Sequence, residues 1–308
     1  MTSASAPLFP VVRGLIATTL LLLVGVILAE GIVARRVTGR DAAVDAELRG
    51  WFTRLPGLLG WFMLMLSLGR AALQLLSFVD PGESVTTDLI RGMLWQGSWG
   101  NAWVLQTSAA FALLTTSWLL RNNERVRRPV TVLLVAALLW SETGMGHAAD
   151  ALWGPWLGRI VSMTHLIGGG YWLGTLGALA LIVFPALRGD SHLPTLAAVV
   201  RDFSVPARIG AALLLISGVR STWTDAGSLA AIPTTTWGQL LIAKVACLAG
   251  VAAIGWWNWK VVTPGLERGL PIAPSRLRRA VVIELSLGLV MLAITAFLIA
   301  APLPVHAS

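Results

Sequence analysis

Long apolar stretches restrict the possible folds of this chain more than any other feature of the sequence. A helix needs about 20 mainly apolar residues to cross the hydrocarbon core of a bilayer. The 308-residue sequence has eight such stretches, joined by short loops. They are residues 11–34, 55–79, 101–120, 129–146, 156–187, 203–222, 237–259 and 279–301. The pattern predicts an all-α bundle of about eight transmembrane helices in one transmembrane domain, without a separate soluble domain.

Composition supports a membrane location and excludes several other classes of protein. Asp, Glu, Lys and Arg make up 12% of the residues, whereas soluble domains average about 25%. The single cysteine, Cys247, excludes an internal disulfide and a multi-cysteine zinc or iron–sulfur site. The first apolar stretch is long and no clear small-residue cleavage site follows it, so we interpret it as a span rather than a signal peptide.

The distribution of Lys and Arg between the loops predicts the orientation of the chain. The odd-numbered loops and their margins carry 17 of these residues, and the even-numbered loops and the termini carry four. Cytoplasmic loops of membrane proteins are enriched in Lys and Arg. We therefore expect both termini on the outer side. The net charge of +8 then indicates contact with anionic lipid, and no nucleic-acid partner is expected.

One predicted span carries an arginine within a polar stripe. Ionisable side chains at membrane depth are costly and usually have a partner or a function. The stripe has steps of three and four residues, and it consists of Met63, Ser67, Arg70, Gln74 and Ser77. Residues at this spacing share one face of a helix, so we expect the stripe to face protein rather than lipid.

Further polar residues lie within the later spans. Glu142 lies near the outer end of the fourth span, and Lys244 lies about two turns below the outer end of the seventh, on the same face as Asn258. One interpretation is that Arg70, Glu142 and Lys244 are ion-pair or hydrogen-bond partners that only fix the packing. Glu284, toward the inner end of the eighth span, is expected to be solvated or interfacial; the alternative is that it joins Glu30 in a proton path near the inner face.

Two histidines and a methionine are the candidate metal ligands. His147 ends the fourth span, two residues after Met145, and His165 lies about 12 Å inside the fifth span. A short outer loop joins the two spans, so these three side chains are expected in one outer-leaflet region. Imidazole and thioether groups are ligands that suit a soft copper ion. The alternative for His165 is an interhelical hydrogen bond.

Small residues on the fifth span predict close helix packing. Five glycines cluster within the span, at positions 168, 169, 170, 174 and 177. Faces of small residues let helices approach one another closely in membranes. We therefore expect another helix to approach this span.

The second half of the chain resembles the CopD family of bacterial inner-membrane copper resistance proteins. The matching elements, in order, are Gly146-His147-Ala148, His165, Trp172-Leu173-Gly174, Phe203-Ser204, Ser217-Gly218, the run from Trp237 to Lys244, Asn258, the run from Arg278 to Glu284, and Pro302. The family usually has Tyr-Gly where this chain has Trp237-Gly238. The resemblance covers residues 146–302, and the first four spans, within residues 1–145, match only in topology.

The resemblance implies copper handling at the bacterial inner membrane, commonly beside a small periplasmic copper-binding protein of the CopC type. It implies metal-linked roles for His147 and His165. It also marks Trp172, Lys244, Asn258 and Glu284 as motif positions without an assigned role. Oligomeric state and the direction of copper movement stay open.

Three functional hypotheses follow, none of them enzymatic, because hydrolase, phosphate-binding-loop and zinc-protease motifs are absent. The first is a copper transport protein that binds Cu(I) at Met145, His147 and His165. The second is an assembly factor that delivers copper from the same site without transporting it. The third is a membrane electron carrier that binds haem b through two axial histidines.

Overall fold

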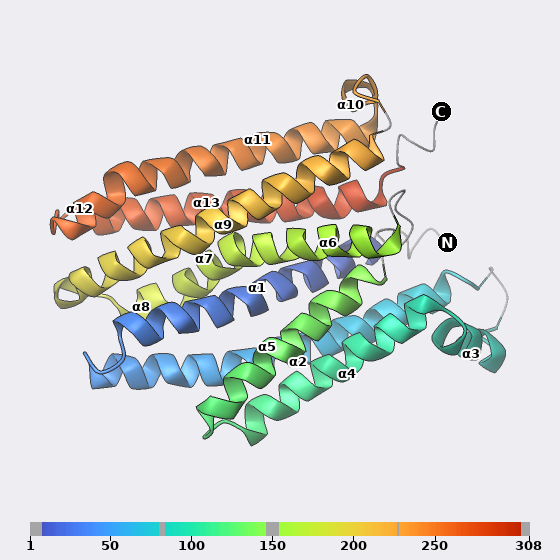
Figure 1. Cartoon of the computed structure of the whole chain (residues 1–308), viewed down its shortest axis with the longest axis horizontal. Coiled ribbons are helices and arrows are strands. Elements are labelled where there is room, and N and C mark those ends of the chain that lie inside the picture. Colours follow the sequence, from blue (N-terminus) through green and yellow to red (C-terminus); the bar gives the residue numbers. More distant parts are fainter. Residues whose placement is uncertain (1–7, 80–83, 146–153, 227, 303–308) are drawn as a thin grey trace. The chain divides into compact units, whose positions relative to one another are not determined.

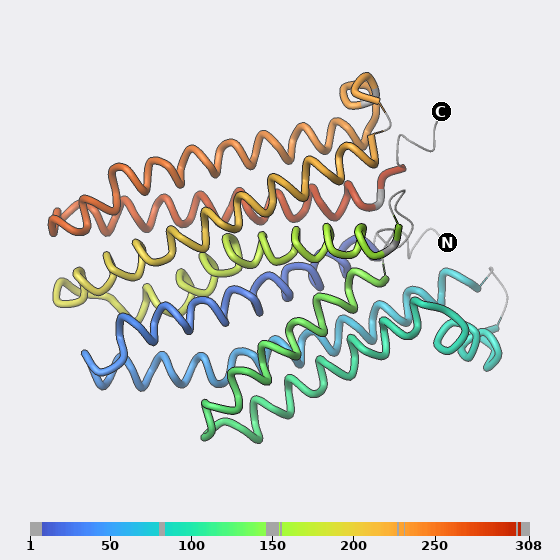
Figure 2. The backbone as a smooth tube through the Cα atoms, viewed as in Figure 1, coloured from blue at the N-terminus to red at the C-terminus, as the bar shows by residue number. Residues whose placement is uncertain are grey.

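The computed structural model describes residues 8–79, 84–145, 154–226 and 228–302. These residues form helices joined by turns and short loops, and no strand occurs among them (Figures 1 and 2). The all-α prediction is therefore confirmed. The helices group into two compact units. The first unit holds the described parts of Met1–Leu20 and Thr53–Leu166, and the second holds those of Leu21–Phe52 and Ile167–Ser308.

The first unit is built around a pair of packed helices (Figure 1). Its elements are the start of α1 (Leu8–Arg36), most of α2 (Ala42–Leu76), α3 (Thr87–Trp95), α4 (Ser98–Leu119), α5 (Glu124–Thr143) and most of α6 (Pro155–Gly169). The α4–α5 pair is joined at Asn123, whose side chain caps α5 by accepting a hydrogen bond from the Val126 N–H. Gly60 lets α2 approach α4, because a Cβ there would lie 3.0 Å from the Leu114 backbone nitrogen.

The second unit contains several helices that include π-turns. After the end of α1 and the start of α2, its elements are η2 (Gly170–Gly174), α7 (Thr175–Ala178), η3 (Leu179–Val183), α8 (Phe184–Ala186), η4 (Asp190–His192), α9 (Leu193–Asp225), α10 (Ala231–Thr234), α11 (Thr236–Trp257), η5 (Asn258–Val262), α12 (Thr263–Glu267) and α13 (Ala273–Ala300). Segments η2, η3 and η5 are π-turns within longer helical runs. Helices α11 and α13 run side by side in Figure 1.

Glycines of the fifth predicted span bring α1 into close contact within the second unit. A Cβ at Gly174 would lie 1.8 Å from the Leu21 carbonyl oxygen, and one at Gly25 would lie 1.9 Å from the Gly174 carbonyl carbon. Only residues without a side chain allow two backbones to approach so closely. The predicted close approach is confirmed, and the partner is α1.

An ion pair ties α1 to α9 within the same unit. The Arg36 guanidinium donates two hydrogen bonds of 2.7 Å to the carboxylate of Asp202, which precedes the predicted span 203–222. These hydrogen bonds favour the ionised form and hold the pKa of Asp202 below its usual range.

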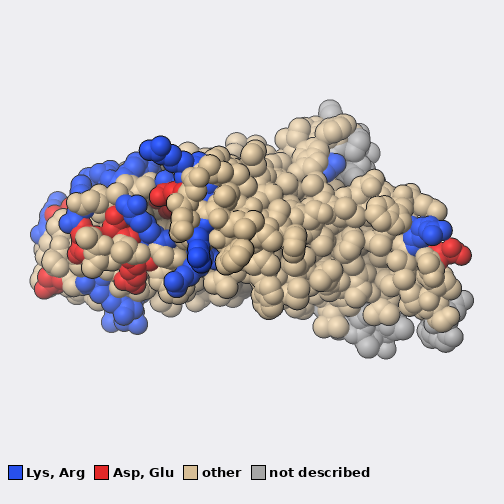
Figure 3. Space-filling view, turned by 90° about the horizontal axis from the view of Figure 1, so that it is seen from below, with Lys and Arg blue, Asp and Glu red and all other residues tan. Residues whose placement is uncertain are grey.

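Each predicted span coincides with helix over most of its length. In chain order the spans correspond to α1, α2, α4, α5, the run α6–α8, α9, the run α11–α12, and α13. In the part of the chain that the structure describes, five helices are long and apolar enough to cross a membrane, namely Leu8–Arg36, Ala42–Leu76, Trp156–Ala186, Thr236–Glu267 and Ala273–Ile299. A broad stretch of the surface in Figure 3 carries no charged side chain among its described residues. The chain is therefore a multi-pass membrane protein, and the count of eight spans stays a prediction.

The helices extend beyond the predicted spans at several ends, most of all at the start of α2, which begins at Ala42 rather than at residue 55. Helix α9 begins at Leu193, ten residues before the predicted start of its span, because a further run of mainly apolar residues, with Leu196 and Val199 buried, precedes Arg201 and Asp202. The seventh predicted span ends at residue 259, but its helix continues through the π-turn η5 to Glu267. The sequence also did not predict α3, a short helix capped by the Thr86 side chain.

The contact between α1 and η2 predicts a strong effect of a single methyl group. Replacing Gly174 with Ala places that group against the Leu21 carbonyl, so we expect a loss of about 1–3 kcal/mol in the free energy of unfolding. Thermal unfolding in detergent measures this loss. Gly218→Ala on α9 is the control, because a Cβ there meets nothing within 4 Å and alanine favours helix. Equal stability of the two variants would contradict the close contact.

Candidate functional site

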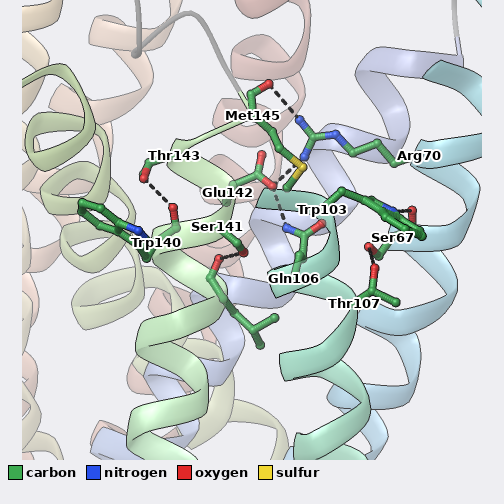
Figure 4. Close-up of polar contacts among 11 residues, drawn as sticks. Ser67, Arg70, Trp103, Gln106, Thr107, Trp140, Ser141, Glu142, Thr143 and Met145 are labelled. Carbon is green, nitrogen blue, oxygen red and sulfur yellow. Dashed lines mark hydrogen bonds and ion pairs between the residues drawn. The ribbon is translucent and has the colours of Figure 1, made fainter. Parts of the chain in front are cut away.

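A buried ion pair lies at the centre of the first unit (Figure 4). Arg70 of α2 and Glu142 of α5 approach to 2.7 Å between Nη1 and Oε2. The side chain of Arg70 is 1% exposed and that of Glu142 is 12% exposed. Each charge is costly to bury alone, so each side chain provides the partner that the other requires.

Neighbouring groups complete the surroundings of the pair. The Gln106 amide of α4 donates to Glu142 Oε2 (3.0 Å), and Arg70 Nη2 donates to the Met145 carbonyl oxygen (3.4 Å) just beyond the end of α5. Met145 lies two residues beyond α5, so Arg70 links the chain that follows this helix to α2. Arg13 of α1 interacts electrostatically with both Arg70 and Glu142. This cluster carries more positive than negative charge.

A second set of hydrogen bonds fixes α2 against α4 beside the ion pair (Figure 4). The indole N–H of Trp103 donates to the Ser67 carbonyl oxygen (2.8 Å), and the hydroxyls of Ser67 and Thr107 are 2.8 Å apart. Met63, Ser67 and Arg70 are all buried. The predicted polar stripe therefore faces protein at these positions.

The predicted copper ligands belong to the first unit as far as the structure describes them. Met145 is buried directly after α5, and His165 is half-buried on α6. His147 lies outside the described residues, so the convergence of the three side chains stays a prediction. Within the described ranges, no group of three or more His, Cys, Asp or Glu residues could hold a metal ion.

Sequence reasoning missed two polar contributors to this region. Gln106 follows Trp103 and precedes Thr107 on one face of α4, and that spacing could have identified it as a partner of the α2 stripe. Arg159 of α6 lies over the Trp140 ring at 3.9 Å and donates to the Trp140 carbonyl oxygen (3.0 Å). This stacking depends on the fold, and no sequence spacing indicates it.

The second unit brings together three motif residues whose roles were unassigned. Asn258 Nδ2 donates to Glu284 Oε1 at 2.6 Å, and the Trp172 side chain donates to the same carboxyl group. Glu284 is only 4% exposed. The expectation that Glu284 is solvated or interfacial is therefore wrong, because α13 packs this residue against its neighbours. Lys244 is half-buried and forms no hydrogen bond or ion pair with any described residue.

Comparison with known protein families covers both halves of the chain. Residues 1–154 match the family model "Copper resistance protein D-like, N-terminal domain", and residues 197–298 match "Copper resistance protein D". The chain belongs to the copper resistance protein D family. No curated protein and no solved structure matches significantly.

The family matches cover the first half of the chain as well as part of the second half, where the sequence resemblance was found. The first four spans, which resembled the family only in topology, lie within the copper resistance N-terminal match. That match includes Arg70, Gln106 and Glu142, and the second match includes Asn258 and Glu284. His165 and Trp172 lie between the two matched ranges. Membership indicates a role in copper handling.

The burial of the Arg70–Glu142 pair predicts a large loss of stability when one partner is removed, and a much smaller loss when both are removed. Glu142→Gln leaves the guanidinium buried without its counter-charge, so we expect a loss of about 3–5 kcal/mol in the free energy of unfolding in detergent. Glu124→Gln is the control, because the Glu124–Arg128 pair is exposed and such pairs contribute less than about 1 kcal/mol. The double variant Arg70→Leu/Glu142→Leu should recover most of the loss. A double variant as unstable as Glu142→Gln would contradict this account.

Proposed function

We propose that this protein binds copper at an outer-face site formed by Met145, His147 and His165, and moves it across the bacterial inner membrane. The observation that carries the proposal is the family match over both halves of the chain, which indicates copper handling. The uneven distribution of Lys and Arg supports an orientation in which this site faces outward.

The buried cluster of the first unit supports neutral, soft ligands for the copper ion. Oε2 of Glu142 accepts from both Arg70 and Gln106, and the ion pair with Arg70 neutralises the charge by which this carboxylate would attract a metal ion. The excess positive charge of the cluster also disfavours a doubly charged ion nearby. A thioether and two imidazoles are neutral ligands that suit Cu(I). We therefore propose Cu(I) as the bound species.

The ion pair supports this site through the position of Met145. Arg70 holds the Met145 carbonyl and, at the same time, the carboxylate of Glu142 three residues earlier. These contacts fix the end of α5 and the Met145 backbone, and His147 follows Met145 by two residues. In our proposal Arg70 and Glu142 are therefore positioning residues rather than ligands.

The source or recipient of the copper is proposed to be a periplasmic protein of the CopC type, which commonly accompanies members of this family. Delivery to such a partner without transport would use the same site. Flux of copper into sealed vesicles that contain the purified protein distinguishes the two functions, because only transport requires uptake.

The metal content of the purified protein tests the proposed copper site directly. We expect protein purified under reducing conditions to carry roughly one copper per chain, and the His147→Ala/His165→Ala variant to lose it. Elemental analysis measures copper and iron together. His192→Ala is the matched control, because this histidine lies in the short η4 segment beside Asp41 and should leave copper unchanged. Retention of copper by the double variant would contradict the site, and iron in place of copper would favour haem b.

A further inference from the structure

A carboxyl group is buried in the second unit without a positively charged partner. Glu284 lies in the buried stripe of α13, between Val281 and Gly288. Its two hydrogen-bond donors, the amide of Asn258 and the indole of Trp172, are both neutral. No described residue forms an ion pair with it. An ionised carboxylate in such surroundings is unfavourable, so an uncompensated buried carboxyl within a membrane segment indicates a functional site.

The Asn258 amide lacks the hydrogen bond that a proton on Glu284 would supply. Its Nδ2 donates to Glu284, but its Oδ1 is buried and has no partner among the described residues. An ionised carboxylate only accepts hydrogen bonds, whereas a protonated carboxyl also carries one O–H donor. A proton on the carboxyl group would supply the kind of donor that Asn258 Oδ1 lacks, while Oε1 still accepts from Nδ2.

Both residues that donate hydrogen bonds to this carboxyl lie in π-turns rather than in regular α-helix. Asn258 is the first residue of the π-turn η5, and Trp172 lies within the π-turn η2. Such turns often occur at functional sites. One turn from Glu284, a Cβ at Gly288 would lie 2.4 Å from Leu173 Cδ1. This close packing holds the neighbouring Trp172 against α13.

Charged groups on the neighbouring elements do not compensate Glu284. Helix α13 packs against α11, η5, α12 and α7, and α7 has no ionisable residue. Lys244 on α11 lies 14 residues before Asn258, which is about 21 Å along the helix. The remaining ionisable residues on these elements, on η2 and on the preceding turns of α13 are Cys247, Lys260, Glu267, Tyr171, Arg276, Arg278 and Arg279. Lys260 and the three arginines are exposed, and Glu267 pairs with Arg201.

We propose that Glu284 and Asn258 form a proton-binding site, and that exchange of this proton accompanies copper movement. The second part of this proposal rests on the proposed function. The proton leaves Glu284 Oε2 for water, and the carboxylate that remains still accepts from Asn258 and Trp172. Both states of the site therefore have hydrogen-bond partners, which a site that alternates between them requires.

Infrared difference spectra of the full chain in detergent, recorded between acidic and alkaline pH, test the proton site. We expect a carbonyl-stretching band of a protonated carboxyl that shifts in D₂O and is lost on deprotonation. Glu284→Gln should lack this band, and Glu267→Gln, which alters an exposed carboxyl, should keep it. Asn258→Ala should move its frequency, because the acceptor is removed. A band that persists in Glu284→Gln, or no such band in the wild type, would overturn the proposal.

Vesicles that enclose a pH-sensitive dye test the coupling. Copper added to wild-type vesicles should move protons, and Glu284→Gln should lose this proton movement while its copper content per chain is unchanged. Equal proton movement in Glu284→Gln would overturn the coupling. If wild-type vesicles take up no copper but the infrared band is present, the transport function fails and the proton site stands, so the two failures are distinguishable.

Discussion

Charged groups buried in an apolar environment must be compensated, and this requirement shapes both units of the protein. In the first unit the compensation is an ion pair, in which Arg70 and Glu142 neutralise each other. Gln106 donates a further hydrogen bond to the Glu142 carboxylate. In the second unit Glu284 receives only neutral hydrogen bonds. A pair of opposite charges is stable in one state, whereas a carboxyl with neutral partners can hold or release a proton. The first arrangement suits a fixed support and the second suits an exchanging site.

Close backbone packing makes these arrangements possible. The carbonyl of Leu21 lies where a side chain on Gly174 would be, and Leu173 occupies the corresponding space at Gly288. These contacts place the segment around Trp172 between α1 and α13 within the second unit. Residues without side chains therefore determine which polar groups meet, although they contribute no chemistry themselves.

Much of the fold follows from the sequence, because apolar stretches of sufficient length predict helices with good reliability. The protein-facing stripe through Arg70 and the close approach at Gly174 were also predictable, since both depend on local spacing. The partners of polar residues were not. Gln106 and Arg159 act through contacts between helices, and the π-turn at Asn258 shifts the helix register, which no regular repeat indicates. The burial of Glu284 depends in the same way on how α13 packs.

The proposed copper site consists of Met145 together with histidines at the outer face. X-ray absorption at the copper edge of the Cu(I)-loaded protein measures the ligands directly. We expect one sulfur ligand together with imidazole nitrogens, and Met145→Leu should remove the sulfur signal. Met65→Leu, at an exposed position of α2, should leave the signal unchanged. Coordination without sulfur in the wild type, or a sulfur signal that survives in Met145→Leu, would show that Met145 is not a copper ligand.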